Sequence, residues 1–122
     1  MALGASMKEI LKHIQSVKSD EHLRDFARRN YGLEMLYHLR IAEDNGSEVS
    51  ITHLHKLLSE PKPTQIALRD FIAFLQSKRR VTVTSSEIKR NRKAVKLSPD
   101  VSEKFNSFVA TLCADIKSSG HS

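Results

Sequence analysis

The spacing of apolar residues changes near residue 80, and this change limits the folds that the chain can form. Before it, apolar residues recur at steps of three and four, which predicts helices. After it, Val81–Thr84 and Val95–Leu97 alternate apolar and polar side chains, which predicts two short strands. We therefore expect several helices followed by a β-hairpin whose connecting loop is long and polar.

Capping and breaking residues divide the first eighty residues into helices. We predict helices over residues 7–18, from 19 or 20 to 29, from 33 to Asp44, from 51 to 58 and over 65–78. Ser50 and Thr64 are the expected N-caps of the last two, and Pro61 and Pro63 bar a continuous helix between them. The third helix is expected to bury one face, made of Leu33, Leu36, Tyr37 and Ile41.

The order of these elements predicts a mainly α fold with a small β-hairpin, a winged helix-turn-helix flanked by N- and C-terminal helices. The chain of 122 residues is 39% hydrophobic, enough for one core, so we expect a single domain over 1–122. Its expected parts are N-terminal helices over 7–30, a winged core over 31–98, a C-terminal helix over 99–118 and a tail over 119–122. We assign no functional role to the first six residues.

Positive charge is concentrated around the predicted hairpin. The chain carries +6 overall, and the stretch from Lys78 to Lys96 has eight basic residues and only Glu87 as an acid, a net +7. The remainder therefore carries −1. This distribution is typical of a surface that binds a polyanion, although a solvated charged loop is the alternative.

The helix over 65–78 is the candidate recognition helix. Its apolar stripe, Leu68, Phe71, Ile72 and Leu75, is expected to face the core. The polar or small residues expected to face DNA are Thr64, Gln65, Arg69, Ala73 and Gln76. Gln and Arg can form paired hydrogen bonds with adenine and guanine edges in the major groove. The wing is expected to contact the backbone or minor groove through Ser86, Lys89, Arg90, Asn91, Arg92 and Lys93.

The segment from about Tyr31 to Asp100 resembles the MarR family of winged-helix regulators, including its Sar-like branch. The similar stretches are the helix over 50–58, the helix over 66–75 and the wing end over 92–98, where Ser98 takes the place of the family's Thr. Arg79 or Arg80 stands where the family has a glycine before the first wing strand. The resemblance implies a bacterial transcription regulator that binds double-stranded DNA as a homodimer, with room for a small-molecule effector that the sequence does not identify.

The resemblance also implies that the terminal helices form the dimer interface. The final helix, begun by Ser98-Pro99-Asp100, supports this with its own apolar stripe, which needs burial. The predicted interface residues are Ile10, Ile14, Val101, Phe105, Phe108, Leu112 and Ile116. The alternative is that this stripe packs within one chain.

Other classes of function find little support in the sequence. His53 and His55 lie two residues apart and would point in different directions on a helix, and a single cysteine, Cys113, excludes a Cys-rich zinc site. There is no phosphate-binding glycine loop and no evident catalytic arrangement, so we expect no enzyme and no cofactor. We expect a cytoplasmic, nucleoid-associated protein without a membrane partner. The alternatives left open are a winged-helix protein-interaction module and a non-specific architectural nucleic-acid binder.

Overall fold

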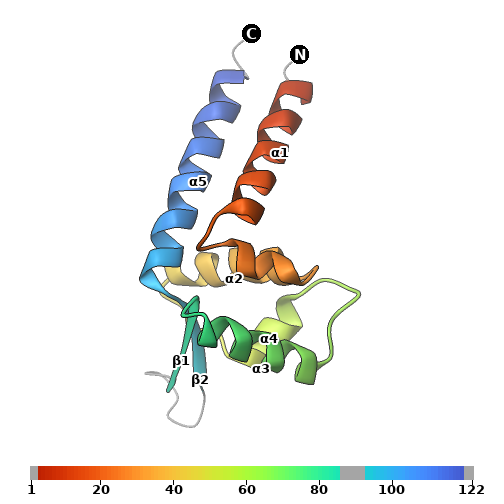
Figure 1. The fold of residues 1–122 in the computed structure, drawn as a ribbon, viewed down its shortest axis with the longest axis vertical. Coiled ribbons are helices and arrows are strands. Elements are labelled where there is room, and N and C mark those ends of the chain that lie inside the picture. The colour runs from red at the N-terminus through yellow and green to blue at the C-terminus, as the bar shows by residue number, and fades with distance from the viewer. Residues whose placement is uncertain (1–2, 86–92, 120–122) are drawn as a thin grey trace.

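The computed structural model describes residues 3–85 and 93–119 and consists of helices with one two-stranded sheet. The elements are α1 (Leu3–Ser19), the 3₁₀ helix η1 (Arg24–Arg28), α2 (Gly32–Asp44), α3 (Ile51–Leu57), α4 (Gln65–Ser77), β1 (Val81–Ser85), β2 (Lys93–Leu97) and α5 (Pro99–Ser119). Figure 1 shows that α1 and α5 lie side by side and project from a body formed by the other elements. The fold is a winged helix-turn-helix with an additional helix at each end, as the sequence predicts.

The β-hairpin is held to the body at its base. Strands β1 and β2 are antiparallel, with Val81 opposite Leu97 and Ser85 opposite Lys93. The Val95 amide donates to the carbonyl of Val49, just before α3, at 2.8 Å. The Ser98 hydroxyl donates to the carbonyl of Arg79 at 2.6 Å. These bonds fix the position of the hairpin relative to the helix-turn-helix.

The turn between α4 and β1 places a non-glycine residue in the left-handed region. Arg79 has φ of 61°, and the Arg80 amide donates to the carbonyl of Leu75 at 2.9 Å. This arrangement closes the end of a helix and usually has a glycine at the left-handed position. The structure therefore explains why a glycine would be expected here, and it shows that Arg79 adopts the same conformation.

One continuous core joins the body to the base of the two terminal helices. Its fully buried residues come from every helix and from both strands, for example Phe26, Leu36, Leu54, Leu68 and Phe105. The predicted stripe of α4, Leu68, Phe71, Ile72 and Leu75, is at most 4% exposed. That prediction is confirmed.

Two predictions about the first half of the chain are wrong in detail. Residues 19–29 form only a short 3₁₀ helix, because the Asp20 carboxylate accepts a hydrogen bond from the His22 amide and makes a local turn. In α2 the buried residues are Met35, Leu36 and Leu39, whereas Tyr37 and Ile41 are 39% and 54% exposed. Helix α2 has apolar residues on more than one face, so their spacing alone does not predict which face is buried.

Helix α1 is longer than predicted, since it begins at Leu3 and includes residues to which the sequence assigned no role. Helix α5 begins at Pro99 and extends one residue beyond the predicted end at 118. No helix in the described part of the chain is long and apolar enough to span a membrane. Cys113 is exposed on α5.

Candidate nucleic-acid interface

Helix α4 presents the predicted recognition residues to solvent. The Thr64 hydroxyl accepts a hydrogen bond from the Ala67 amide at 3.0 Å, so Thr64 is the N-cap, as predicted. The remaining predicted residues on α4, Gln65, Arg69, Ala73 and Gln76, are all exposed. The structure therefore leaves this face free to approach another molecule, and whether it reads bases remains a prediction.

Hydrogen bonds fix the turn that joins α3 to α4. The imidazole Nε2 of His55 lies 2.7 Å from the carbonyl oxygen of Pro63, one residue before the N-cap of α4. The Glu34 carboxylate accepts bonds of 2.6 Å from both the amide and the hydroxyl of Ser59. The bonds from Ser59 hold the pKa of Glu34 below its usual value. The orientation of α4 thus depends on polar contacts with α2 and α3.

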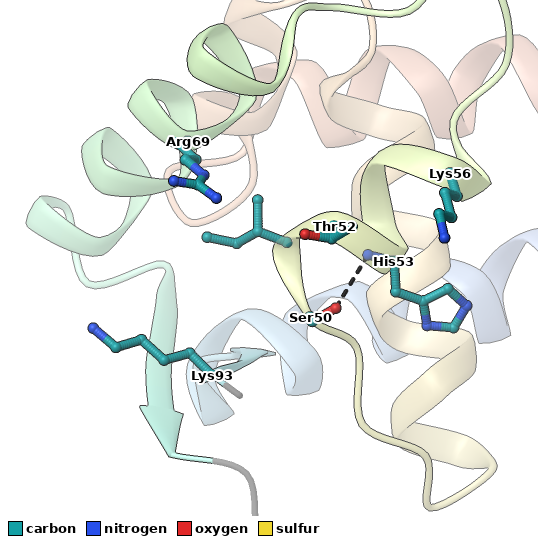
Figure 2. Close-up of a pocket in the computed structure, with 7 residues that line it drawn as sticks. Ser50, Thr52, His53, Lys56, Arg69 and Lys93 are labelled. Atoms are coloured by element: carbon teal, nitrogen blue, oxygen red, sulfur yellow. Dashed lines mark hydrogen bonds between the residues drawn. The ribbon is translucent and has the colours of Figure 1, made fainter. Parts of the chain in front are cut away.

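A basic groove of about 610 Å³ lies beside α4. We call it the basic groove; its lining residues are Ser50, Ile51, Thr52, His53, Lys56, Arg69 and Lys93. Figure 2 shows Arg69 and Lys93 on one side of the first turn of α3 and His53 and Lys56 on the other. None of the described residues that line the groove is acidic. This arrangement suits a negatively charged, extended ligand such as a sugar-phosphate backbone.

The wing contributes Lys93 to this groove. Lys93 is the first residue of β2, it is exposed, and it pairs with Ser85 across the hairpin. The other predicted wing residues, Ser86, Lys89, Arg90, Asn91 and Arg92, lie outside the described residues.

Sequence reasoning missed Ile66 and the residues at the start of and along α3 that line the basic groove, such as Lys56. Ile66 is 74% exposed, more than any other large apolar residue in the described part of the chain. It projects about 60° from Arg69 around α4, because successive residues of a helix are about 100° apart. Lys56 of α3 lines the basic groove. The helical spacing that selected Arg69 would also have selected Ile66 if apolar residues had been considered for the outward face.

The predicted dimer residues fall into two groups. Ile10 and Ile14 of α1 are 43% and 38% exposed, and Met7 and Leu11 on the same helix are 56% and 53% exposed. On α5, the side chains of Phe108, Leu112 and Ile116 are partly buried. The four exposed side chains of α1 leave apolar surface that a second chain could cover.

Val101 and Phe105 do not belong to such an interface. They are 0% and 1% exposed within a single chain, where they pack in the core at the base of α5. For these two residues the dimer prediction is wrong, because the first turns of α5 pack against the body. The alternative considered from the sequence, packing within one chain, holds for this part of the stripe.

A histidine lies where α1 meets α2 and α5. His13 is 6% exposed, its Nε2 lies 2.5 Å from the hydroxyl of Tyr37, and the Tyr37 ring contacts Phe105 edge-on at 4.9 Å between centroids. Burial lowers the pKa of His13 below its usual value of 6.5, against the opposing effect of a backbone hydrogen bond at Phe108. The neutral imidazole therefore fits this junction better than the charged one.

No metal site is formed by the described residues, among which no three His, Cys, Asp or Glu side chains gather. His53 and His55 have separate surroundings: His53 lines the basic groove and His55 bonds to the carbonyl of Pro63.

Comparisons with known proteins find similarity only at the level of solved structures. No protein-family profile matches the chain, and no curated protein matches it. One similar structure is BpsR of Bordetella bronchiseptica, whose DNA binding is regulated by 6-hydroxynicotinic acid. It has 16% identity and a TM-score of 0.49, over 96% of this chain and 77% of that one. Another is YusO of Bacillus subtilis, with 16% identity and a TM-score of 0.49, over 92% of this chain and 74% of that one.

Proposed function

We propose that this chain binds double-stranded DNA in a sequence-specific manner as a homodimer and regulates transcription. Helix α4 lies in the major groove, and the wing contacts the backbone or the adjacent minor groove. Such a protein acts in the bacterial cytoplasm on the nucleoid.

The outward face of α4 carries the proposal. A helix about 10–12 Å across fits a major groove about 12 Å wide, provided that its outward side chains can reach base edges. Arg69 and Gln65 are exposed on α4, and each can make a paired hydrogen bond with a purine.

The basic groove supplies the second part of the proposed interface. Contacts to phosphates position a protein on DNA, and most of them come from basic, hydroxyl and amide groups. Lys56 and Lys93 are the groove's lysines, and Figure 2 shows the hydroxyls of Ser50 and Thr52 between these two side chains. We propose that one DNA backbone lies in this groove while α4 reads the bases beside it.

The exposed apolar residues of α1 support the homodimer. Met7, Ile10, Leu11 and Ile14 recur at steps of three, one and three, which places them along one face of the helix. A stripe of this kind is a sign of an interaction surface. Two chains joined along α1 and the outer part of α5 would present two copies of α4 to successive major grooves, about 34 Å apart.

The test compares two parts of the proposed interface on two duplexes. Arg69→Ala should cost about 1–3 kcal/mol on a preferred duplex and relax the preference at one position of each half-site. The Arg90→Ala, Arg92→Ala double variant should weaken binding to preferred and scrambled duplexes by similar factors. It should also reduce the salt dependence by about one unit for each phosphate that the protein no longer binds.

The measurement is a titration of each variant against both duplexes at two salt concentrations. An equal decrease in affinity for both duplexes with Arg69→Ala would show that α4 does not read bases, which favours the non-specific binder. If the affinity of the unaltered protein for DNA does not change with salt concentration, contact with phosphates is excluded and a protein-interaction module is favoured.

A further inference from the structure

Three basic side chains from distant parts of the sequence meet on two phenylalanines of α4. The guanidinium of Arg28 lies 4.8 Å from the centre of the Phe74 ring, and the Lys78 ammonium lies 5.9 Å from the same ring. The guanidinium of Arg29 lies 6.0 Å from the centre of the Phe71 ring. The fold therefore adds Arg28 and Arg29, which lie outside the basic stretch from Lys78 to Lys96, to the surface beside α4.

The two phenylalanines form a fixed platform. Their rings are stacked, 6.2 Å apart between centroids and inclined by 13°, and Phe71 is only 4% exposed. Tyr31 packs edge-on against Phe71 at 5.5 Å. A cation over an aromatic face is attracted by the ring, and a guanidinium stacked in this way is held in place before any ligand arrives.

This platform borders a hollow on the flank of α4 that faces away from the basic groove. The hollow has a volume of about 300 Å³ and is lined by Arg28, Arg29, Ala67, Asp70, Phe71 and Phe74. Ala67 and Phe74 project about 140–160° from Arg69 around α4, by the helical angle of about 100° per residue. Ile66 lies between the two directions, so α4 has cationic side chains on both of its flanks.

The charges in the hollow leave the arginines available. Asp25 lies 3.0 Å from Arg80 and 3.8 Å from Arg28, so its carboxylate is held mainly by Arg80, and the Arg28 side chain remains 60% exposed. Asp70 is the acid among the described lining residues, and the two arginines outnumber it.

We infer that Arg28 and Arg29 bind phosphates of the DNA strand opposite to the one in the basic groove. This inference rests on the proposed function. A helix inserted in a major groove has a sugar-phosphate backbone on each side, because the groove is little wider than the helix. The basic groove receives one backbone, and the arginine pair on the Phe71–Phe74 platform receives the other. Guanidinium groups match phosphate oxygens with two parallel hydrogen bonds.

An acidic protein segment could also bind two arginines. The position of the pair favours DNA, since such a segment has no reason to bind alongside the outward face of α4.

The experiment uses the full chain and two variants with the same change in net charge. The test variant is Arg28→Gln with Arg29→Gln. The control is Lys8→Gln with Lys12→Gln, two exposed lysines on α1, far from α4. Affinity is measured over a salt series on a duplex selected from a random pool. Phosphate ethylation interference on the same duplex then maps the contacts on each strand.

For the test variant we expect the slope of log affinity against log salt to fall by about 0.9 for each phosphate that is no longer bound, so by one to two units for each copy of α4 engaged. We also expect ethylation to stop interfering with binding at phosphates on one strand of each half-site, while interference on the other strand remains. The control variant should show interference on both strands and a salt slope close to that of the unaltered chain. Thermal unfolding of both variants should match that of the unaltered chain.

The inference is overturned if the test variant keeps the interference pattern on both strands, or if its slope equals that of the control. Binding of polyglutamate that is abolished in the test variant alone, with DNA contacts unchanged, would assign the pair to an acidic protein instead. Either result leaves the proposed function intact. If the unaltered chain selects no duplex at all, the proposed function fails first.

Discussion

The helices of the body and of the two-helix arm differ in how much of their apolar stripes is exposed. In the body, formed by α2 to β2, the large apolar residues of α4's inner stripe are at most 4% exposed. In the arm, formed by α1 and the outer part of α5, Met7 and Leu11 are more than half exposed. The body has a basic groove, lined in part by Arg69 and Lys93, and its most exposed large apolar residue is Ile66 of α4. Figure 1 shows the two regions at opposite ends of the molecule.

This difference suits the two regions to different kinds of contact. A helix pair with an uncovered apolar stripe gains stability when a partner buries it. A basic surface attracts anions. We therefore propose that the arm carries self-association and that the body carries DNA binding.

The largest effect on stability is expected from a substitution that disrupts packing in the body. A Cβ atom on Gly32 would lie 1.6 Å from the carbonyl oxygen of Phe26, a backbone atom that cannot move without shifting η1. Gly32→Ala should therefore cost about 3 kcal/mol of unfolding free energy, the upper end of the range for an overpacked core. Urea unfolding measures it.

Gly46→Ala is the matched control. Gly46 has φ of +65°, and an added Cβ would meet nothing within 4 Å, so only the left-handed backbone is strained. Its cost should be about 1–2 kcal/mol. Equal costs for the two alanines would show that the contact between Gly32 and η1 is not close.

The next effect is expected from a charge in the arm. Leu11→Asp should separate the dimer into monomers at micromolar concentration, because it places a carboxylate in the apolar stripe of α1. DNA affinity should then fall on the order of 100-fold, since two half-sites are no longer bound together. Sedimentation and DNA titration measure the two consequences.

Lys12→Gln lowers the net charge by the same one unit at an exposed position of α1, about 100° around the helix from Leu11, and should change neither quantity. If the Leu11→Asp variant sediments with the same molecular mass in solution as the unaltered protein, the arm does not carry the dimer contact.

A smaller effect is expected at Ile66. Its exposed side chain on α4 can touch the 5-methyl group of a thymine. Ile66→Ala should weaken binding to the selected duplex by about 1 kcal/mol, roughly fivefold. Replacing one thymine of each half-site with uracil, which lacks that methyl group, should weaken the unaltered protein similarly and leave Ile66→Ala unaffected. A variant that is as sensitive to uracil as the unaltered chain would contradict this contact.

The smallest effect concerns the junction between arm and body. The pKa of His13 is lowered by burial, so the unfolded chain binds a proton more readily than the folded one below about pH 6.5. Folding stability from this group is present above that pH and is lost as the pH falls toward the lower folded pKa. The thermal midpoint should drop between pH 7.5 and about 5.5, and His13→Gln should drop less. An equal drop in both proteins would exclude His13 as the cause.

The sequence predicted the winged fold and the surface of α4 because both depend on local rules. Thr64 and Ser50 cap their helices, and the spacing of Leu68 to Leu75 selects the buried face. Local rules could not predict that Val101 and Phe105 are buried within one chain. They belong to one continuous apolar stripe of α5, whose first residues pack in the core and whose later residues lie nearer the surface. The platform under Arg28 and Arg29 depends on a contact between η1 and α4 that no periodic pattern contains.

Selection of bound sites from a random duplex pool tests the central claim most directly. If two arms join two bodies and each α4 reads bases, the selected sequences share a palindrome whose half-sites lie about 10 base pairs apart, one helical turn. Uniform recovery of all sequences, or a consensus without two-fold symmetry, would contradict the assignment of DNA reading to α4 and pairing to the arm.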